Sequence, residues 1–264
     1  MLVTGASHGI GLATARLLAA HGYQVFGASR KPPHGELGGV VMLPLDVASD
    51  ESVRSCVAGV LERTGRIDVL VNNAGISLLG AAEEIPVDQA RALYETNLFG
   101  TARMVNAVLP EMRRRRTGLI INLGSVARGL PTPFHGYLSS SKAAIASYSD
   151  ALRLELKPFG IAVTVVEPGM VATHQGERFT QLKPGASIGD YAAGERKAMA
   201  AYEAGQRSGS APELVARTIL RVIGTAAPAR YYLVGRQKWY ARLARILPPS
   251  AVEAVISRRL RLTA

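Results

Sequence analysis

The sequence predicts an α/β protein with a doubly wound, mainly seven-stranded parallel sheet and helices on both faces. Short apolar runs rich in β-branched residues alternate with longer segments of helical period, which is the pattern of repeated βαβ units. A chain of 264 residues in an α/β fold can bury its core as one unit. We therefore expect a single domain over residues 1–264.

Strands and helices follow from this alternation in chain order. The expected strands are 1–3, 24–28, 40–45, 69–72, 118–123, 162–167 and 230–234. The expected helices between them are 10–21, 50–64, 87–112, 138–159 and 212–223. Their order predicts a Rossmann-type topology, in which each helix returns the chain to the same sheet.

Two regions depart from the alternation. Residues 170–210 show no strand pattern and are rich in Gly, which predicts a mobile lid over a substrate. In the basic tail 236–264, apolar residues recur at helical spacing on both sides of Pro248 and Pro249. They predict two short amphipathic helices that cap the pocket, meet another subunit or lie on a membrane.

The composition argues against several kinds of site. Cys56 is the only cysteine and lies among valines at helical spacing, which predicts a buried thiol. The five histidines form no compact ligand cluster, so we expect no metal. No uninterrupted run of eighteen apolar residues suggests a membrane span, and the start MLVTGASHGIG enters structural sequence at once. We expect a cytoplasmic protein.

The net charge of +11 is concentrated in the tail. Residues 230–264 hold eight Arg or Lys against the single acid Glu253. A solvated face on C-terminal helices is the favoured interpretation, and peripheral contact with anionic lipid is the alternative. The residues Arg113 to Arg116 close a long helix, where cations complement the helix dipole. We expect no nucleic-acid partner.

The glycine-rich turn from Thr4 to Gly11 is the strongest functional signal. It joins the first expected strand to the first expected helix, and its glycines let backbone amides approach a phosphate at the helix N-terminus. A glycine triplet alone is weak evidence, but here it stands in the strand-turn-helix context that the chemistry requires. We therefore predict a site for the pyrophosphate of a nicotinamide dinucleotide.

Further motifs accompany this turn in a fixed order. They are Asn72-Asn73-Ala74-Gly75, Asn97, Gly124-Ser125, Lys142 and Pro168-Gly169. With TGxxxGxG at Thr4 to Gly11, the chain resembles a short-chain dehydrogenase/reductase over residues 1 to about 175, and most of all the branch near hydroxysteroid and retinol dehydrogenases. The resemblance implies a sizeable apolar small molecule as the substrate, and a homodimer or homotetramer.

The resemblance also implies which residues hold the dinucleotide. They are Thr4, Gly5, Ser7, His8, Gly9, Ile10, Gly11, Ser29, Arg30, Asp46, Val47, Asn73, Ala74, Gly75, Lys142, Pro168, Gly169, Val171 and Thr173. An acid at the end of the second strand would favour NAD(H), but this chain has Ser29, Arg30 and Lys31 there. A hydroxyl and two cations attract a 2′-phosphate, so we expect NADP(H) rather than NAD(H).

The catalytic pattern departs from the family at one position. The resemblance implies a catalytic tetrad of Asn, Ser, Tyr and Lys. Asn97, Ser125 and Lys142 match three of these four residues. The tyrosine should stand four residues before Lys142, where this chain has Leu138, and Tyr137 precedes it. Helix positions four apart differ by about 40° in azimuth and positions five apart by about 140°, so Tyr137 and Lys142 would face different ways.

Alternatives remain open at this position. Tyr137 could still reach the pocket from a frayed helix end, or a π-bulge could restore the geometry. Equally, Tyr137 could be a packing residue while Leu138 lines the pocket, with His135 or the serines 139–141 as substitute donors. The first hypothesis is an oxidoreductase that interconverts an alcohol and a carbonyl, using Asn97, Ser125, Tyr137 and Lys142. The second is redox-neutral chemistry such as cyclisation or isomerisation, and the third is dinucleotide binding alone.

Overall fold

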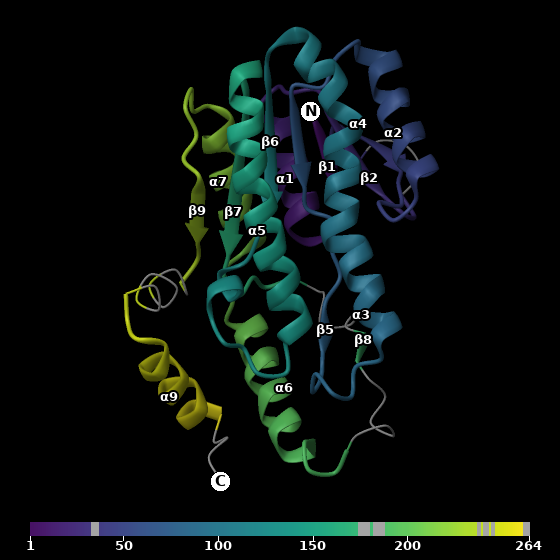
Figure 1. Cartoon of the computed structure of the whole chain (residues 1–264). Helices are drawn as coiled ribbons and strands as arrows, with labels where there is room; N and C mark the ends of the chain where they lie inside the picture. The colour runs from purple at the N-terminus through teal and green to yellow at the C-terminus, as the bar shows by residue number, and fades with distance from the viewer. Residues whose placement is uncertain are drawn as a thin grey trace.

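The protein is described by a computed structural model, which covers residues 1–32, 37–173, 180–181, 188–236, 239, 243 and 246–260. Its main sheet contains β1 (Leu2–Thr4), β2 (Val25–Ser29), β3 (Val40–Pro44), β4 (Val69–Asn72), β6 (Gly118–Leu123), β7 (Ile161–Pro168) and β9 (Tyr231–Val234). The order is β3-β2-β1-β4-β6-β7-β9, and all neighbouring strands are parallel. This confirms the predicted doubly wound fold (Figure 1).

Helices cover both faces of the sheet. One face carries α2 (Asp50–Thr64), α4 (Gly100–Arg115) and α5 (Gly136–Leu156), and the other carries α1 (Gly9–Ala20) and α7 (Pro212–Ile223) (Figure 1). The inner strands β1, β2, β4, β6 and β7 are buried on both faces, which explains why they appear as continuous apolar runs in the sequence, whereas the edge strand β9 is half-buried.

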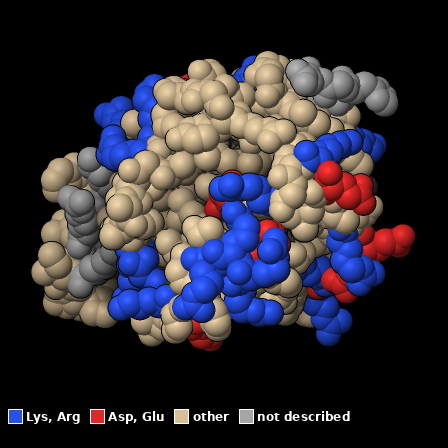
Figure 2. Space-filling view, turned by 90° about the horizontal axis from the view of Figure 1, so that it is seen from above, with Lys and Arg blue, Asp and Glu red and all other residues tan. Residues whose placement is uncertain are grey.

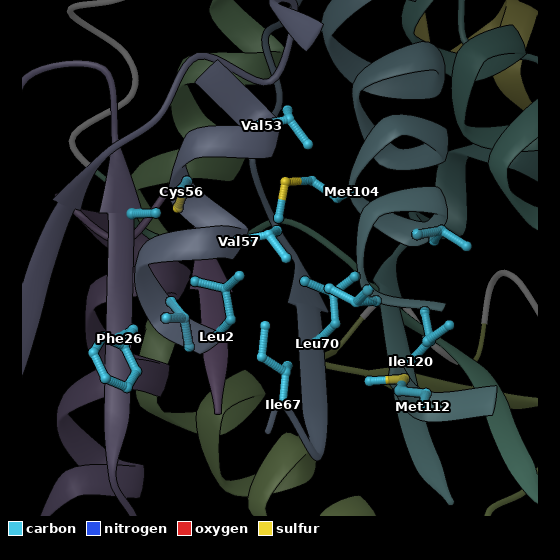
Figure 3. Packing of buried hydrophobic residues seen from close by; sticks show 14 of the residues in the cluster. Leu2, Phe26, Val53, Cys56, Val57, Ile67, Leu70, Met104, Met112 and Ile120 are labelled. Atoms are coloured by element: carbon cyan, nitrogen blue, oxygen red, sulfur yellow. The ribbon is translucent and has the colours of Figure 1, made fainter. Parts of the chain in front are cut away.

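Cys56 lies in the core, as predicted. Its side chain belongs to the cluster between the sheet and the helices α2 and α4, near Val57 on the same helix (Figure 3). Burial raises the pKa of the Cys56 thiol to about 11, so the thiol stays protonated and unreactive at neutral pH.

The single helix expected over 87–112 is interrupted. The structure has α3 (Val87–Tyr94), a π-helical turn (Glu95–Phe99) and then α4. The π-turn places Asn97 inward with no exposed surface, and the Asn97 carbonyl accepts a hydrogen bond from Thr101 Oγ1. Hydrophobic periodicity cannot reveal such a turn, because one extra residue hardly disturbs a long apolar stripe.

The lid region contains more regular structure than expected. A short strand β8 (Thr180–Gln181) pairs with β5 (Leu78–Leu79), and α6 (Ala192–Arg207) follows, so the prediction of a region without strands was wrong. Ala198 is the only buried residue of α6, so this helix lacks the stripe of large apolar side chains by which the other helices were predicted. Residues 174–179 and 182–187 of the expected lid lie outside the described residues.

The tail is described in part. A helix α9 (Pro249–Leu260) coincides with the second predicted amphipathic helix, whereas most of the first predicted helix falls outside the described residues. Among the helices that the structure describes, none combines the length and apolar character needed to span a bilayer.

Basic side chains gather at one end of the molecule, which Figure 2 shows from above. At the end of α4, Arg114 pairs with Glu111, and Arg115 pairs with both Glu111 and Asp68. The Arg116 guanidinium donates to the Pro158 carbonyl. The arginines at the end of α4 therefore stabilise a helix terminus and the adjoining loops, as the sequence predicts.

Candidate active site

The site forms where the strand order reverses. The chain leaves β1 towards β2 on one side and reaches β4 on the other, and ligands of open α/β sheets bind at such a switch point. Thr4 and Asn73 join the two strand ends here: Thr4 Oγ1 accepts from the backbone N–H groups of Asn73 and Ala74, both at 3.0 Å. The Asn73 amide in turn donates to the carbonyls of Thr4 and Gly5, at 3.0 and 3.1 Å.

The glycine-rich turn is packed too closely for side chains. Gly5 and Gly9 have φ angles of +65° and +55°, which glycine adopts without strain. A Cβ on Gly11 would lie 2.3 Å from the Gly5 carbonyl oxygen and 2.5 Å from Asn73 Nδ2. Gly11 thus holds α1 against the turn and leaves the backbone amides at the helix start beside the cavity. This arrangement fits a dinucleotide pyrophosphate.

A cavity of about 750 Å³ adjoins the turn, a volume suited to an organic ligand. Most of the predicted cofactor residues line it: Gly5, His8, Ile10, Asn73, Ala74, Gly75, Lys142, Pro168, Gly169, Val171 and Thr173. Thr4, Ser7, Gly9, Gly11, Ser29, Arg30, Asp46 and Val47 do not line it. Of these, Ser7 hydrogen-bonds to the ring of the lining residue His8 at 2.9 Å.

Four of the residues expected to hold the dinucleotide lie outside the cavity wall, namely Ser29, Arg30, Asp46 and Val47. The Ser29 hydroxyl is buried at the end of β2 without a hydrogen-bond partner, and Arg30 beside it is exposed. Asp46 Oδ1 accepts from the Ala48 N–H at 3.0 Å, which fixes the turn after β3. The Val47 side chain is buried in the core.

Ser125 and Lys142 lie in the cavity wall, on the 3₁₀ turn after β6 and on α5. Ser125 Oγ accepts from the Ala127 N–H at 3.1 Å, which leaves the hydroxyl proton for a substrate oxygen. Lys142 Nζ donates to the Leu123 carbonyl at 2.8 Å. Burial lowers the pKa of Lys142 to about 8, which brings this ammonium into the range of acid-base catalysis.

Asn97 lies behind the cavity wall. Its Oδ1 accepts from the Ile76 N–H at 2.8 Å, and its Nδ2 donates to the Ile76 carbonyl at 3.0 Å and to Ser141 Oγ at 3.2 Å. Ser141 Oγ donates to the Leu138 carbonyl at 2.8 Å. Asn97 therefore joins the chain after β4 to the second turn of α5.

Leu138 and Tyr137 face different surroundings. Leu138 lines the cavity together with Lys142 and Ser125. Tyr137 packs against the apolar cluster that includes Leu78 and Leu93, and it is not among the lining residues. This is the arrangement that the helical azimuths of positions four and five residues apart predict.

The alternatives open at the start of α5 can be compared with its backbone. The helix runs as an α-helix from Gly136, and the Ser139 N–H donates to the His135 carbonyl at 2.9 Å in the α pattern. Ser140 and Ser141 donate to backbone carbonyls three residues before them, and neither lines the cavity. Of the suggested substitute donors, His135 alone is among the described lining residues.

The individual residues of the outer wall were not predicted, although most of them lie in the range 170–210 that the sequence predicts to cover a substrate. The outer wall is formed by residues of α6 and by neighbouring loops: Ser77, Thr132, Pro133, Met170, Ala198, Ala201, Tyr202, Gly205, Gln206 and Arg236. No motif marks these positions, because a substrate wall follows the shape of its ligand. The available signals were the glycine-rich composition of residues 170–210 and the helical spacing of Ala198, Ala201 and Gly205.

Comparisons with known proteins found similar chains and a similar solved structure. A family model described as short chain dehydrogenase matches residues 1–183. The chain is 37% identical over 228 residues to a 3-ketodihydrosphingosine reductase of Bacteroides thetaiotaomicron, covering 86% of this chain and 84% of the relative. It is 35% identical over 251 residues to a retinol dehydrogenase 8 of Bos taurus, covering 86% and 78%. A crystal structure of a short-chain dehydrogenase from Streptomyces avermitilis superposes with a TM-score of 0.82 at 30% identity, covering 99% and 96%.

Proposed function

Because this chain belongs to the short-chain dehydrogenase/reductase family, we propose that it is an NADP(H)-dependent oxidoreductase that interconverts an alcohol and a carbonyl on an apolar small molecule. One observation carries the proposal: the wall that includes the glycine-rich turn also includes Ser125 and Lys142. Its outer part is apolar at Met170, Ala198 and Ala201. The cytoplasmic location and the homodimer or homotetramer stay predictions.

Two residues of the chain would act on the substrate oxygen, one by a hydrogen bond and the other by proton transfer. The cofactor, when bound, supplies or removes the hydride. Ser125 donates its hydroxyl proton to the carbonyl oxygen and holds it as charge develops. The Lys142 ammonium gives the oxygen its proton, directly or through Ser125, since Leu138 has none to give. Asn97 acts as a positioning residue, and Tyr137 packs beside the site.

We expect the wild type to oxidise NADPH with apolar ketones at a rate that falls as pH rises through about 8. Above this pH, Lys142 loses the proton that reduction consumes, whereas alcohol oxidation, which needs a base, gains. Lys142→Met should reduce the rate about 10²-fold or more and remove this pH dependence. The measurement is NADPH absorbance against a ketone panel between pH 6 and 10.

A redox-neutral reaction or dinucleotide binding alone is the second candidate, and Leu138 in the cavity wall favours it. The NADPH assay with the ketone panel distinguishes this second candidate function from the oxidoreductase. A protein that binds NADPH, as followed by nucleotide fluorescence, but oxidises it with none of the ketones would contradict the oxidoreductase proposal. If ketone reduction by Lys142→Met kept the pH dependence of the wild type, Lys142 would be excluded as the proton source. The proposal that the protein is an oxidoreductase would still stand.

Arg30→Ala should weaken NADPH binding about 10-fold to 100-fold and leave NADH binding nearly unchanged. The exposed guanidinium follows the buried, unpartnered Ser29 hydroxyl, and together they suit a ribose 2′-phosphate. The measurement is the Kd of each nucleotide by fluorescence titration. Arg113→Ala at the far end of the molecule is the matched control for the loss of one exposed positive charge. Equal losses of NADPH and NADH affinity in Arg30→Ala would exclude a 2′-phosphate contact.

A further inference from the structure

His135 occupies a helix-capping position without capping the helix. It is the N-cap residue of α5, and its backbone carbonyl accepts from Ser139, but its side chain makes no capping hydrogen bond. Ser, Thr, Asn or Asp usually stand at this position, because their side chains satisfy the free N–H groups of the first turn. Capping of α5 therefore does not explain why a histidine stands at position 135.

The His135 side chain is instead part of the cavity wall. It is 6% exposed, and its ring lies 5.0 Å from the Tyr202 ring on α6. Its Nε2 atom is buried and has no hydrogen-bond partner. Two further lining residues share this feature, since Ser77 Oγ and Gln206 Oε1 are also buried without partners. Buried polar atoms are normally paired, and because these three atoms belong to residues that line one cavity, a ligand in it could supply their partners.

The hydrogen bonding of the His135 ring indicates that its Nε2 atom can accept a hydrogen bond. His135 forms a hydrogen bond with the backbone of Pro133, which has no N–H and can offer only its carbonyl. Because Nε2 has no partner, this bond uses Nδ1, which must carry the proton. Nε2 then presents a lone pair. Burial lowers the pKa of His135 to about 4, so the ring stays neutral at physiological pH.

From these contacts we infer that His135, with Ser77 and Gln206, forms a polar subsite that accepts a hydrogen bond from a hydroxyl or amino group of the substrate, separate from the carbonyl at Ser125. The inference deepens the proposed function and rests on it for the reacting carbonyl. It narrows the substrate to an apolar ketone or alcohol that bears a second polar group. His135 is thus a specificity-determining residue, because its lone pair cannot give a proton to the reacting oxygen.

Matched ligands test this subsite. The probes are medium-chain ketones with a hydroxyl at successive distances from the carbonyl, each compared with its methyl ether and with the unsubstituted ketone. Binding to the NADP⁺-loaded protein is measured by calorimetry, which needs no turnover. We expect at least one hydroxyketone to bind about tenfold more tightly than both its ether and its parent, because only the hydroxyl donates a hydrogen bond.

Variants assign the preference to His135. His135→Phe should lose it while binding the parent ketone and NADPH as the wild type does, and His135→Gln, which keeps an acceptor, should retain part of it. Thr132→Val is the matched control, because Thr132 lines the same cavity but its hydroxyl already donates to the Leu130 carbonyl at 3.1 Å. Absence of a preference in the wild type, or its persistence in His135→Phe, would overturn the subsite. A preference that depends on His135 in a protein that reduces no ketone would leave the subsite standing and reject the oxidoreductase.

Discussion

Leu138→Tyr is expected to raise the kcat of ketone reduction by about 10²-fold to 10⁴-fold, the usual contribution of a positioned general acid. Leu138 and Lys142 stand four residues apart on a regular stretch of α5, and both line the cavity. A phenol at position 138 would lie beside the Lys142 ammonium, which would lower the phenol pKa and stabilise the phenolate left after proton transfer. The measurement is steady-state NADPH oxidation with the best ketone of the wild type.

Two neighbouring substitutions are controls for this gain. Leu138→Phe adds the same ring without the hydroxyl and should remain near the wild-type rate. Tyr137→Phe should also leave the rate unchanged, because Tyr137 packs against Leu78 and Leu93 and does not line the cavity. A hundredfold loss in Tyr137→Phe would identify the Tyr137 hydroxyl as the acid. A Leu138→Tyr variant no faster than Leu138→Phe would contradict the geometry proposed for the reacting oxygen.

Gly11→Ala is expected to abolish measurable NADPH binding and to destabilise the fold. The new methyl group would lie 2.3 Å from the Gly5 carbonyl oxygen, and neither this backbone atom nor the adjoining Asn73 amide can move without opening the junction of β1 and β4. Overpacking of this kind costs about 1–3 kcal/mol, and each kcal/mol lowers the Tm of a chain of this size by about 2–4 °C. Thermal unfolding and nucleotide titration measure the two effects.

Gly59→Ala is the matched control for Gly11→Ala. Gly59 lies within α2, where a Cβ would meet no atom within 4 Å, so the substitution should raise stability slightly through the helix preference of alanine. NADPH affinity should not change. If Gly11→Ala bound NADPH as tightly as Gly59→Ala, the glycine-rich turn would not hold the pyrophosphate.

The sheet and the part of the cavity wall at the glycine-rich turn could be predicted because simple repeats encode them. Buried parallel strands produce apolar runs, and a close backbone approach requires glycine at fixed spacing, as Gly5 and Gly11 show. The position of Leu138 could also be deduced, because a regular helix fixes azimuth from residue number alone.

The π-turn at Asn97 and the outer wall could not be predicted in this way. The π-turn depends on Asn97 bonding to Ile76, which is 21 positions away in the chain. The unpartnered Nε2 of His135 depends on Tyr202 and on the fold around them, so the sequence offers only a histidine near a motif. Contacts between distant segments leave no local pattern to read.

The residues of α6 also bear on how readily the enzyme could change substrates. Its cavity face presents Ala198, Ala201 and Gly205, and a Cβ at Gly205 would approach Met170, whose flexible side chain can move aside. None of these positions belongs to the main sheet or to its two large core clusters. Single methyl groups could therefore be added to or removed from the substrate wall at little cost to the fold. Substitutions on this one helix could therefore change the length of substrate that the cavity accepts without changing the residues at the glycine-rich turn.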